Sequence, residues 1–156
     1  MSSEILGSRL EGSTLIVETA DGPETYDSQF LVAAMLIYVA RGSGQIEPEE
    51  SSQIIDLVEE HFGIKGAASL ELITRALSEM ADKPTLVNLL ADLAPTLSDQ
   101  EKEDVALMCL KVVAADGQRD VAEMEQFNKA MDAIGVSAEI THRAFDRYFE
   151  QTSPGT

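Results

Sequence analysis

The sequence predicts a small, acidic, all-α protein with about seven helices packed in one domain. Three observations favour this fold class. The chain has 156 residues, a length typical of one domain. Aromatic residues make up only 5% of it and Trp is absent, so we expect a core of Leu, Ile, Val, Met and Ala, which suits helices better than sheets. Apolar residues recur at helical spacing from Asp27 onward.

The N-terminal segment departs from the helical pattern. Residues Thr14–Thr19 are β-prone, and Asp21–Pro23 is a turn signal that precedes Glu24–Tyr26. We expect a short β-hairpin or an extended arm over 1–26, lying on the helical body, because an isolated two-stranded hairpin is only marginally stable in water. The helical domain is then expected over 27–150, and 151–156 is expected to be a mobile tail.

Four helices are predicted in the first half of the chain. The first runs from Asp27 to Arg41, and Pro48 fits the first turn of the second, which Gly63 ends. A third is expected over about 69–81, and a short fourth over about 84–95, between two prolines. The third helix carries four apolar residues on one side: Leu70, Ile73, Leu77 and Met80.

Three helices are predicted in the second half, each with a capping residue. Ser98–Glu101 has the spacing of a capping box and opens a fifth helix that reaches Ala115. Asp120–Glu123 offers the same reciprocal geometry to a sixth helix, which ends near Gly135. Ser137 is expected to cap a seventh helix running to about residue 149.

The chain contains an internal repeat. When it is aligned on itself, Val32–Gln53 matches Val105–Gln126. The matches include apolar positions of the first helix of each unit, the Gly-Gln pair of the turn, and a Glu and a Gln in the second helix. The alignment predicts two helix–turn–helix units related by pseudo-symmetry.

The turn of the second unit carries a family resemblance. Val113–Gln118, followed by Asp120 and Glu123, resembles the Ala-x-Ala-Asp-Gly-x-(Ile)-x-x-x-Glu signature of the TerB-like (tellurite-resistance) family. The first unit has a similar copy in which Ser43 replaces the Asp, and Arg119 replaces the usual apolar residue in the second unit. The resemblance covers about residues 30–150.

The resemblance implies a fold and a role without a mechanism. Members of the family are all-helical, with about seven helices in a repeated TerB-like bundle. The family is linked to tellurite and other stress resistance in bacteria, and related domains occur in membrane-anchored DnaJ-like co-chaperones. Metal binding by its acidic residues has been proposed, and no catalytic activity is established for it. We therefore expect a non-enzymatic stress-response domain that acts through protein interactions, with partners the sequence does not identify.

The turn Asp116–Glu123 invites comparison with the calcium loop of an EF-hand. Placing Gly117 at loop position 6 puts Asp116, Asp120 and Glu123 at positions 5, 9 and 12, which all match. Positions 1 and 3 are then Val and Ala in this unit, and they offer no side-chain oxygen. Half the ligands are missing, which excludes a self-sufficient EF-hand.

Two interpretations of these acidic residues remain. In the first, Asp116, Asp120 and Glu123 supply carboxylates to a weak Ca²⁺ or Mg²⁺ site, completed by water or by Glu47 and Glu50 of the first unit. In the second, the same residues only bond nearby amides and cap the next helix, and the protein is a purely structural helical interaction module with no metal binding.

The charge of the chain excludes some classes of partner. Twenty-eight acidic residues against eleven basic ones give a formal net charge of −17. Nucleic-acid phosphates and anionic membrane surfaces would be repelled, whereas metal ions or basic protein patches are attracted. In the alternative interpretation, the acidity only keeps the protein soluble. The apolar run Phe30–Ala40 is too short to span a bilayer, so no direct membrane insertion is expected.

Catalytic and redox motifs are sparse. Glu139 and His142 form one Glu-x-x-His, whereas a di-iron bundle needs two, and His61 fits a helix C-terminus better than a ligand role. No phosphate loop or nucleophile elbow is present, so we expect no enzyme activity. The single Cys109 lies in an apolar run and is expected to be buried and inert. With no visible secretory signal, we expect a cytoplasmic protein.

Overall fold

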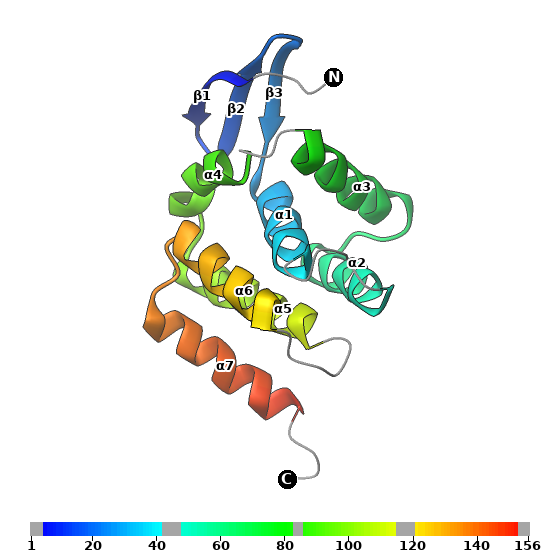
Figure 1. Ribbon diagram of the computed structural model, residues 1–156, viewed down its shortest axis with the longest axis vertical. Helices are drawn as coiled ribbons and strands as arrows, with labels where there is room; N and C mark the ends of the chain where they lie inside the picture. The colour runs from blue at the N-terminus through cyan, green and yellow to red at the C-terminus, as the bar shows by residue number, and fades with distance from the viewer. Residues whose placement is uncertain (1–4, 42–47, 83–85, 115–120, 153–156) are drawn as a thin grey trace.

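The computed structural model describes residues 5–41, 48–82, 86–114 and 121–152 (Figure 1). Within these ranges the chain is mostly helical, with a short antiparallel sheet at its N-terminal end. The elements, in chain order, are β1 (Ile5–Glu11), β2 (Thr14–Thr19), β3 (Gly22–Tyr26), α1 (Ser28–Ala40), α2 (Pro48–Phe62), α3 (Ala67–Asp82), α4 (Leu86–Leu90), the 3-10 helix η2 (Ala91–Thr96), α5 (Asp99–Val113), α6 (Val121–Ala133) and α7 (Ala138–Thr152).

The N-terminal sheet has three strands in the order β1-β2-β3. Strands β2 and β3 coincide with the predicted β-prone segments, but β1 makes the predicted hairpin or arm a three-stranded meander. Strand β1 was missed because six of its seven residues are exposed, so its sequence carries no alternation of buried and exposed positions. In β2 the alternation is clear, with Leu15, Val17 and Thr19 buried.

Helix α1 is the centre of the molecule. It contacts α2, α3, α4, η2, α5 and α6, and all its residues from Phe30 to Ala40 are buried except the half-buried Tyr38. A helix that is apolar on every side requires such a position, because it has no face to present to water. Asp27 caps it, as its carboxylate accepts a hydrogen bond from the backbone N–H of Phe30 at 3.0 Å. No helix in the described ranges is both long and apolar enough to cross a membrane.

An arginine of α3 joins the sheet to the helices. Arg75 donates a hydrogen bond from Nη2 to the carbonyl oxygen of Thr25 at 2.6 Å. Its guanidinium carbon lies 5.0 Å from the ring centroid of Tyr26 and 4.9 Å from that of Phe30, within the range of cation–π attraction. One side chain therefore links β3, α1 and α3.

The apolar side predicted for α3 is only partly buried. Ile73 is buried and Met80 is half-buried, but Leu70 and Leu77 are exposed. Helix α3 packs against α1 and α2 along one narrow stripe, and these two leucines lie outside it. The segment that follows also differs from the prediction, because α4 ends at Leu90 and Pro95 lies within η2. Pro84 lies outside the described residues.

The three C-terminal helices begin largely as predicted. Ser98 and Glu101 form the expected capping box, and the Ser137 hydroxyl accepts a hydrogen bond from the N–H of Ile140. Helix α7 packs on α5 and lies at the opposite end of the molecule from the sheet (Figure 1). It continues to Thr152, so the first two residues of the predicted tail are helical, and 153–156 lie outside the described residues.

Candidate functional site

The predicted metal ligands fall at the margins of what the structure describes. Glu47, Asp116 and Asp120 lie outside the described residues. Glu50 and Glu123 belong to the first turns of α2 and α6, but their side chains also lie outside the description. The metal site therefore stays a prediction. Among the residues that are described, no three His, Cys, Asp or Glu side chains gather as a metal site would require.

The helices on either side of the two acidic turns contact each other. One turn connects α1 to α2 and the other connects α5 to α6. The Nε2 group of Gln126 in α6 donates a hydrogen bond to the carbonyl oxygen of Tyr38 in α1, at 3.4 Å. Helix α1 also contacts α5, and α2 contacts α5. The C-terminal end of α1 thus lies against the first half of α6.

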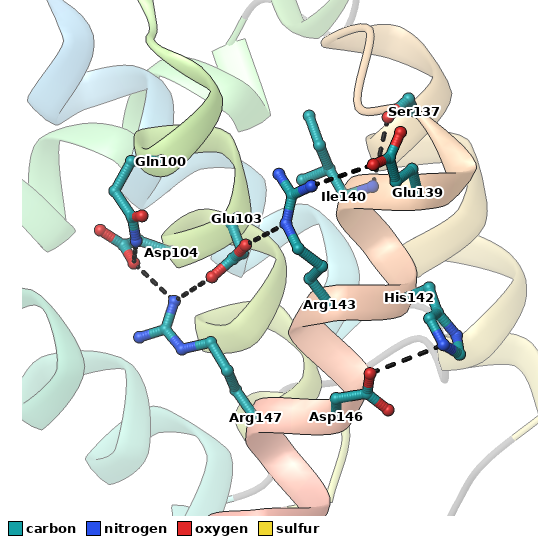
Figure 2. A network of polar contacts seen from close by, with 10 residues as sticks. All are labelled: Gln100, Glu103, Asp104, Ser137, Glu139, Ile140, His142, Arg143, Asp146 and Arg147. Atoms are coloured by element: carbon teal, nitrogen blue, oxygen red, sulfur yellow. Dashed lines mark hydrogen bonds and ion pairs between the residues drawn. The ribbon is translucent and has the colours of Figure 1, made fainter.

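A polar cluster joins α5 to α7 (Figure 2). Glu103 binds two arginines, because its Oε1 accepts from Nε of Arg143 at 2.7 Å and its Oε2 accepts from Nη1 of Arg147 at 2.8 Å. The same Nη1 lies 2.8 Å from Oδ1 of Asp104. Gln100 donates to that Oδ1 at 3.0 Å, and Glu139 lies 3.4 Å from Nη1 of Arg143. We call Glu103, Asp104, Arg143 and Arg147 the α5–α7 cluster.

Burial makes Glu103 the central member of the α5–α7 cluster. Its side chain is 10% exposed, whereas those of Arg143 and Arg147 are 45% and 35% exposed. The hydrogen bond from Arg143 lowers the pKa of Glu103, and Arg147 adds to this effect, while burial opposes it. The carboxyl is therefore ionised at neutral pH and has no proton to donate. Because arginine does not deprotonate either, the cluster can fix α7 on α5 but cannot act as an acid–base pair.

An open groove lies beside the α5–α7 cluster, between α2, α5 and α7. Its volume is about 320 Å³. Leu57, Leu107 and Met108 supply apolar surface, and charged or polar residues complete the lining: Glu60, His61, Asp104, Lys111, Arg147 and Gln151. Acidic and basic groups are mixed in this lining, so the groove favours neither charge of ligand.

The histidine and cysteine predictions can be compared with the structure. His61 lies in the last turn of α2, where its ring meets the ring of Phe62 edge-on at 4.7 Å. His142 is exposed and lies 3.5 Å from Asp146, the residue four positions along α7. Cys109 is buried as expected, and burial raises the pKa of its thiol to about 12. A thiol in that state is not a nucleophile at neutral pH.

The α5–α7 cluster was not predicted from the sequence. Arg143 and Arg147 stand four residues apart on one helix, as do Glu139 and Arg143, and this spacing alone is typical of a solvated helix face. Glu103 and Asp104 directly precede the apolar run that starts at Val105, which places two acids at the edge of the core, but the sequence does not show which of them is buried or which cation binds it.

A family model described as tellurite resistance protein TerB matches residues 29–146. The match begins in α1 and ends in α7, so it covers most of the chain and leaves out the three-stranded sheet. No curated protein and no solved structure matches the chain.

Proposed function

Because this chain belongs to the tellurite resistance protein TerB family, we propose that it is a stress-response domain related to tellurite resistance, acting through protein contacts and not as an enzyme. One observation carries the proposal: the family match over 29–146 coincides with the helical body, from the central α1 to the packed α7. The negative charge of −17 supports a cationic partner, and a reducing cytoplasm suits the single buried Cys109.

The proposal includes a two-fold arrangement of the helix–turn–helix units. In the repeat, α1 corresponds to α5 and α2 corresponds to α6. A two-fold relation requires that the contact of α1 with α6 be matched by a contact of α2 with α5, and both contacts occur. Such a relation would place the α1–α2 turn and the α5–α6 turn beside each other.

The same arrangement favours a shared divalent-cation site. The hydrogen bond between Gln126 and Tyr38 holds the start of α6 against the end of α1. Carboxylates from both turns would then approach one ion: Asp116, Asp120, Glu123, Glu47 and Glu50. Such a site binds Ca²⁺ or Mg²⁺ weakly, since oxygen ligands suit both ions and water completes the shell. In the alternative proposal these residues only cap helices.

Calorimetric titration separates the two versions. The chelator-stripped protein is titrated with Ca²⁺ and Mg²⁺ at physiological salt, together with Asp116→Asn and a matched control, Asp92→Asn, on the exposed surface of η2. The metal version predicts saturable binding that Asp116→Asn abolishes and Asp92→Asn retains. Absence of binding below millimolar concentration would leave the capping version.

Growth in the presence of tellurite tests the role itself. We expect deletion of the gene in its own organism to raise sensitivity to potassium tellurite, and the full chain to restore resistance. Unchanged sensitivity after deletion would contradict the proposed role, whatever the metal titration shows.

A further inference from the structure

A groove runs between α6 and α7. Helix α7 packs chiefly on α5, and it meets α6 where the buried ring of Phe127 lies edge-on to the ring of Phe145, at a centroid distance of 6.0 Å. The groove is hollowed at two places, with volumes of about 390 Å³ and 160 Å³. Phe145 lines both hollows, so they follow one another along the same face of α7. We call this surface the α6–α7 groove.

The lining of the α6–α7 groove is apolar in its smaller hollow and mixed in its larger one. Met124, Phe145 and Tyr148 line the smaller hollow. The larger hollow combines the buried Met131 and Val136 with four polar side chains: Asn128, Asp132, Thr141 and His142. The ring of Phe145 stacks on that of Phe149 at 6.2 Å, and Phe149 is 48% exposed. Methionines and aromatic rings in an open groove are typical of surfaces that receive an apolar helix face.

Acidic side chains flank this apolar lining. On α6, Glu125 and Asp132 are exposed, and Asp132 borders the larger hollow. On α7, Asp146 and Glu150 are exposed, and Asp146 lies 3.5 Å from His142, whereas the exposed Glu139 pairs with Arg143. Arg143 and Arg147 of α7 also bind carboxylates of α5, and Lys129 is an exposed base on α6.

We propose that the α6–α7 groove binds a basic amphipathic helix of a partner protein. This inference rests on the proposed role in protein interaction and names the class of partner. The stretch of α7 from Ala138 to Tyr148 spans about 15 Å at 1.5 Å per residue, which is the length of about three helical turns. Apolar residues at helical spacing fill the groove, and flanking lysines or arginines meet the acidic rims. A second copy of this chain is disfavoured as the occupant, because both copies carry a net charge of −17 and repel each other.

The test uses defined peptides and methionine methyl groups. The probe is a synthetic 18-residue Leu/Lys peptide with leucines at helical spacing (a length of roughly five turns), and a permuted peptide of the same composition is the control. Binding to the full chain is measured by fluorescence anisotropy. NMR of ¹³C-methyl methionine then locates the contact, because Met124 and Met131 line the groove, Met108 lines the α2–α5–α7 groove and Met35 is buried in α1.

A charge-matched pair of variants tests the acidic rims. Asp132→Asn with Asp146→Asn removes two carboxylates beside the groove, and Asp56→Asn with Asp92→Asn removes two exposed carboxylates elsewhere. We expect saturable binding of the amphipathic peptide, shifts at Met124 and Met131 but not at Met35, and about fivefold weaker binding in the first variant pair only.

Every other result overturns the inference. Equal binding of both peptides, or equal weakening by both variant pairs, would show only nonspecific attraction to an acidic surface. Shifts confined to Met108 would show that the peptide binds in the groove between α2, α5 and α7. No binding at millimolar peptide would show that the α6–α7 groove does not bind a basic helix. The tellurite growth assay is independent of these readouts. If the peptide does not bind but the full chain restores tellurite resistance, only the inference about the groove is refuted. If the peptide binds but the full chain does not restore resistance, the proposed function is refuted.

Discussion

Substitution of Glu103 by Gln tests the α5–α7 cluster most directly. Gln has nearly the shape of Glu, so the change removes the charge while the packing of α5 is retained. One carboxylate oxygen becomes an NH₂ group, which faces a guanidinium that also can only donate. The variant therefore loses one charge-assisted hydrogen bond, at 2.7 or 2.8 Å, and weakens the other.

The expected loss of stability follows from the exposure of the partners. Exposed ion pairs contribute about 0–1 kcal/mol, and breaking a buried pair costs about 3–5 kcal/mol. The Glu103 side chain is 10% exposed, but water reaches Arg143 and Arg147, which are 45% and 35% exposed and can be rehydrated. We therefore expect a loss of about 2 kcal/mol. For a chain of this size that lowers Tm by about 4–8 °C.

Urea unfolding followed by far-UV circular dichroism measures this loss, since the chain lacks Trp. The matched control is Glu139→Gln, which removes an 84% exposed carboxylate that also pairs with Arg143 and is expected to change stability by less than about 0.5 kcal/mol. If Glu103→Gln were no more destabilising than Glu139→Gln, the cluster would not fix α7 on α5.

The difference between wild type and Glu103→Gln also depends on pH. Because the pKa of Glu103 is lowered from 4.5 in the folded protein, its contribution is fully present above pH 4.5. It is lost as the pH falls through the folded-state pKa. The two unfolding curves should therefore approach each other below pH 4.5, and a difference that stayed constant into strong acid would contradict the assignment.

Three further predictions concern other parts of the chain. Ser98→Ala should lower the free energy of unfolding by about 1 kcal/mol and Ser98→Gly by only a few tenths, because Gly tolerates the cap position; equal losses in urea unfolding would argue against the capping box. Cys109, with its pKa near 12, should react with a disulfide reagent only as fast as the protein unfolds; prompt labelling in native buffer would contradict its burial. Arg75→Met should lower the free energy of unfolding by about 1 kcal/mol and speed amide hydrogen exchange in β3 more than in other segments. Unchanged exchange in β3 would show that Arg75 does not anchor this strand.

Much of the fold was predictable because local signals and tertiary packing agree. Ser98, Ser137 and Pro48 mark helix starts in the sequence, and the structure begins helices at or directly after each of them. Strand β1 and the exposed Leu70 were not predictable, since their states depend on what packs over them. Periodicity indicates which residues share a face, but not whether another element covers that face.

The candidate sites also differ in whether the local sequence or the packing of distant segments defines them. The acidic turn Asp116–Glu123 is recognisable as a motif because its residues are consecutive, and whether it binds metal stays a prediction. The α5–α7 cluster joins residues about forty positions apart in the chain, Glu103 to Arg143 and Arg147. No local sequence pattern predicts these ion pairs, because they form only when α7 packs on α5. The α6–α7 groove was likewise not predictable, because it depends on how α6 and α7 lie relative to each other.

The burial of α1 on every side has a consequence for synthesis. The helix leaves the ribosome well before α5 and α6, which cover it, and α6 ends at Ala133. At about 5–20 residues per second, the ribosome needs roughly 5–20 s to add the intervening chain. Throughout that interval the sides of α1 that α5 and α6 cover in the folded protein stay exposed to the cell. We expect nascent chains to bind chaperones that recognise apolar segments during this interval, and slow translation after Ala40 to favour their aggregation.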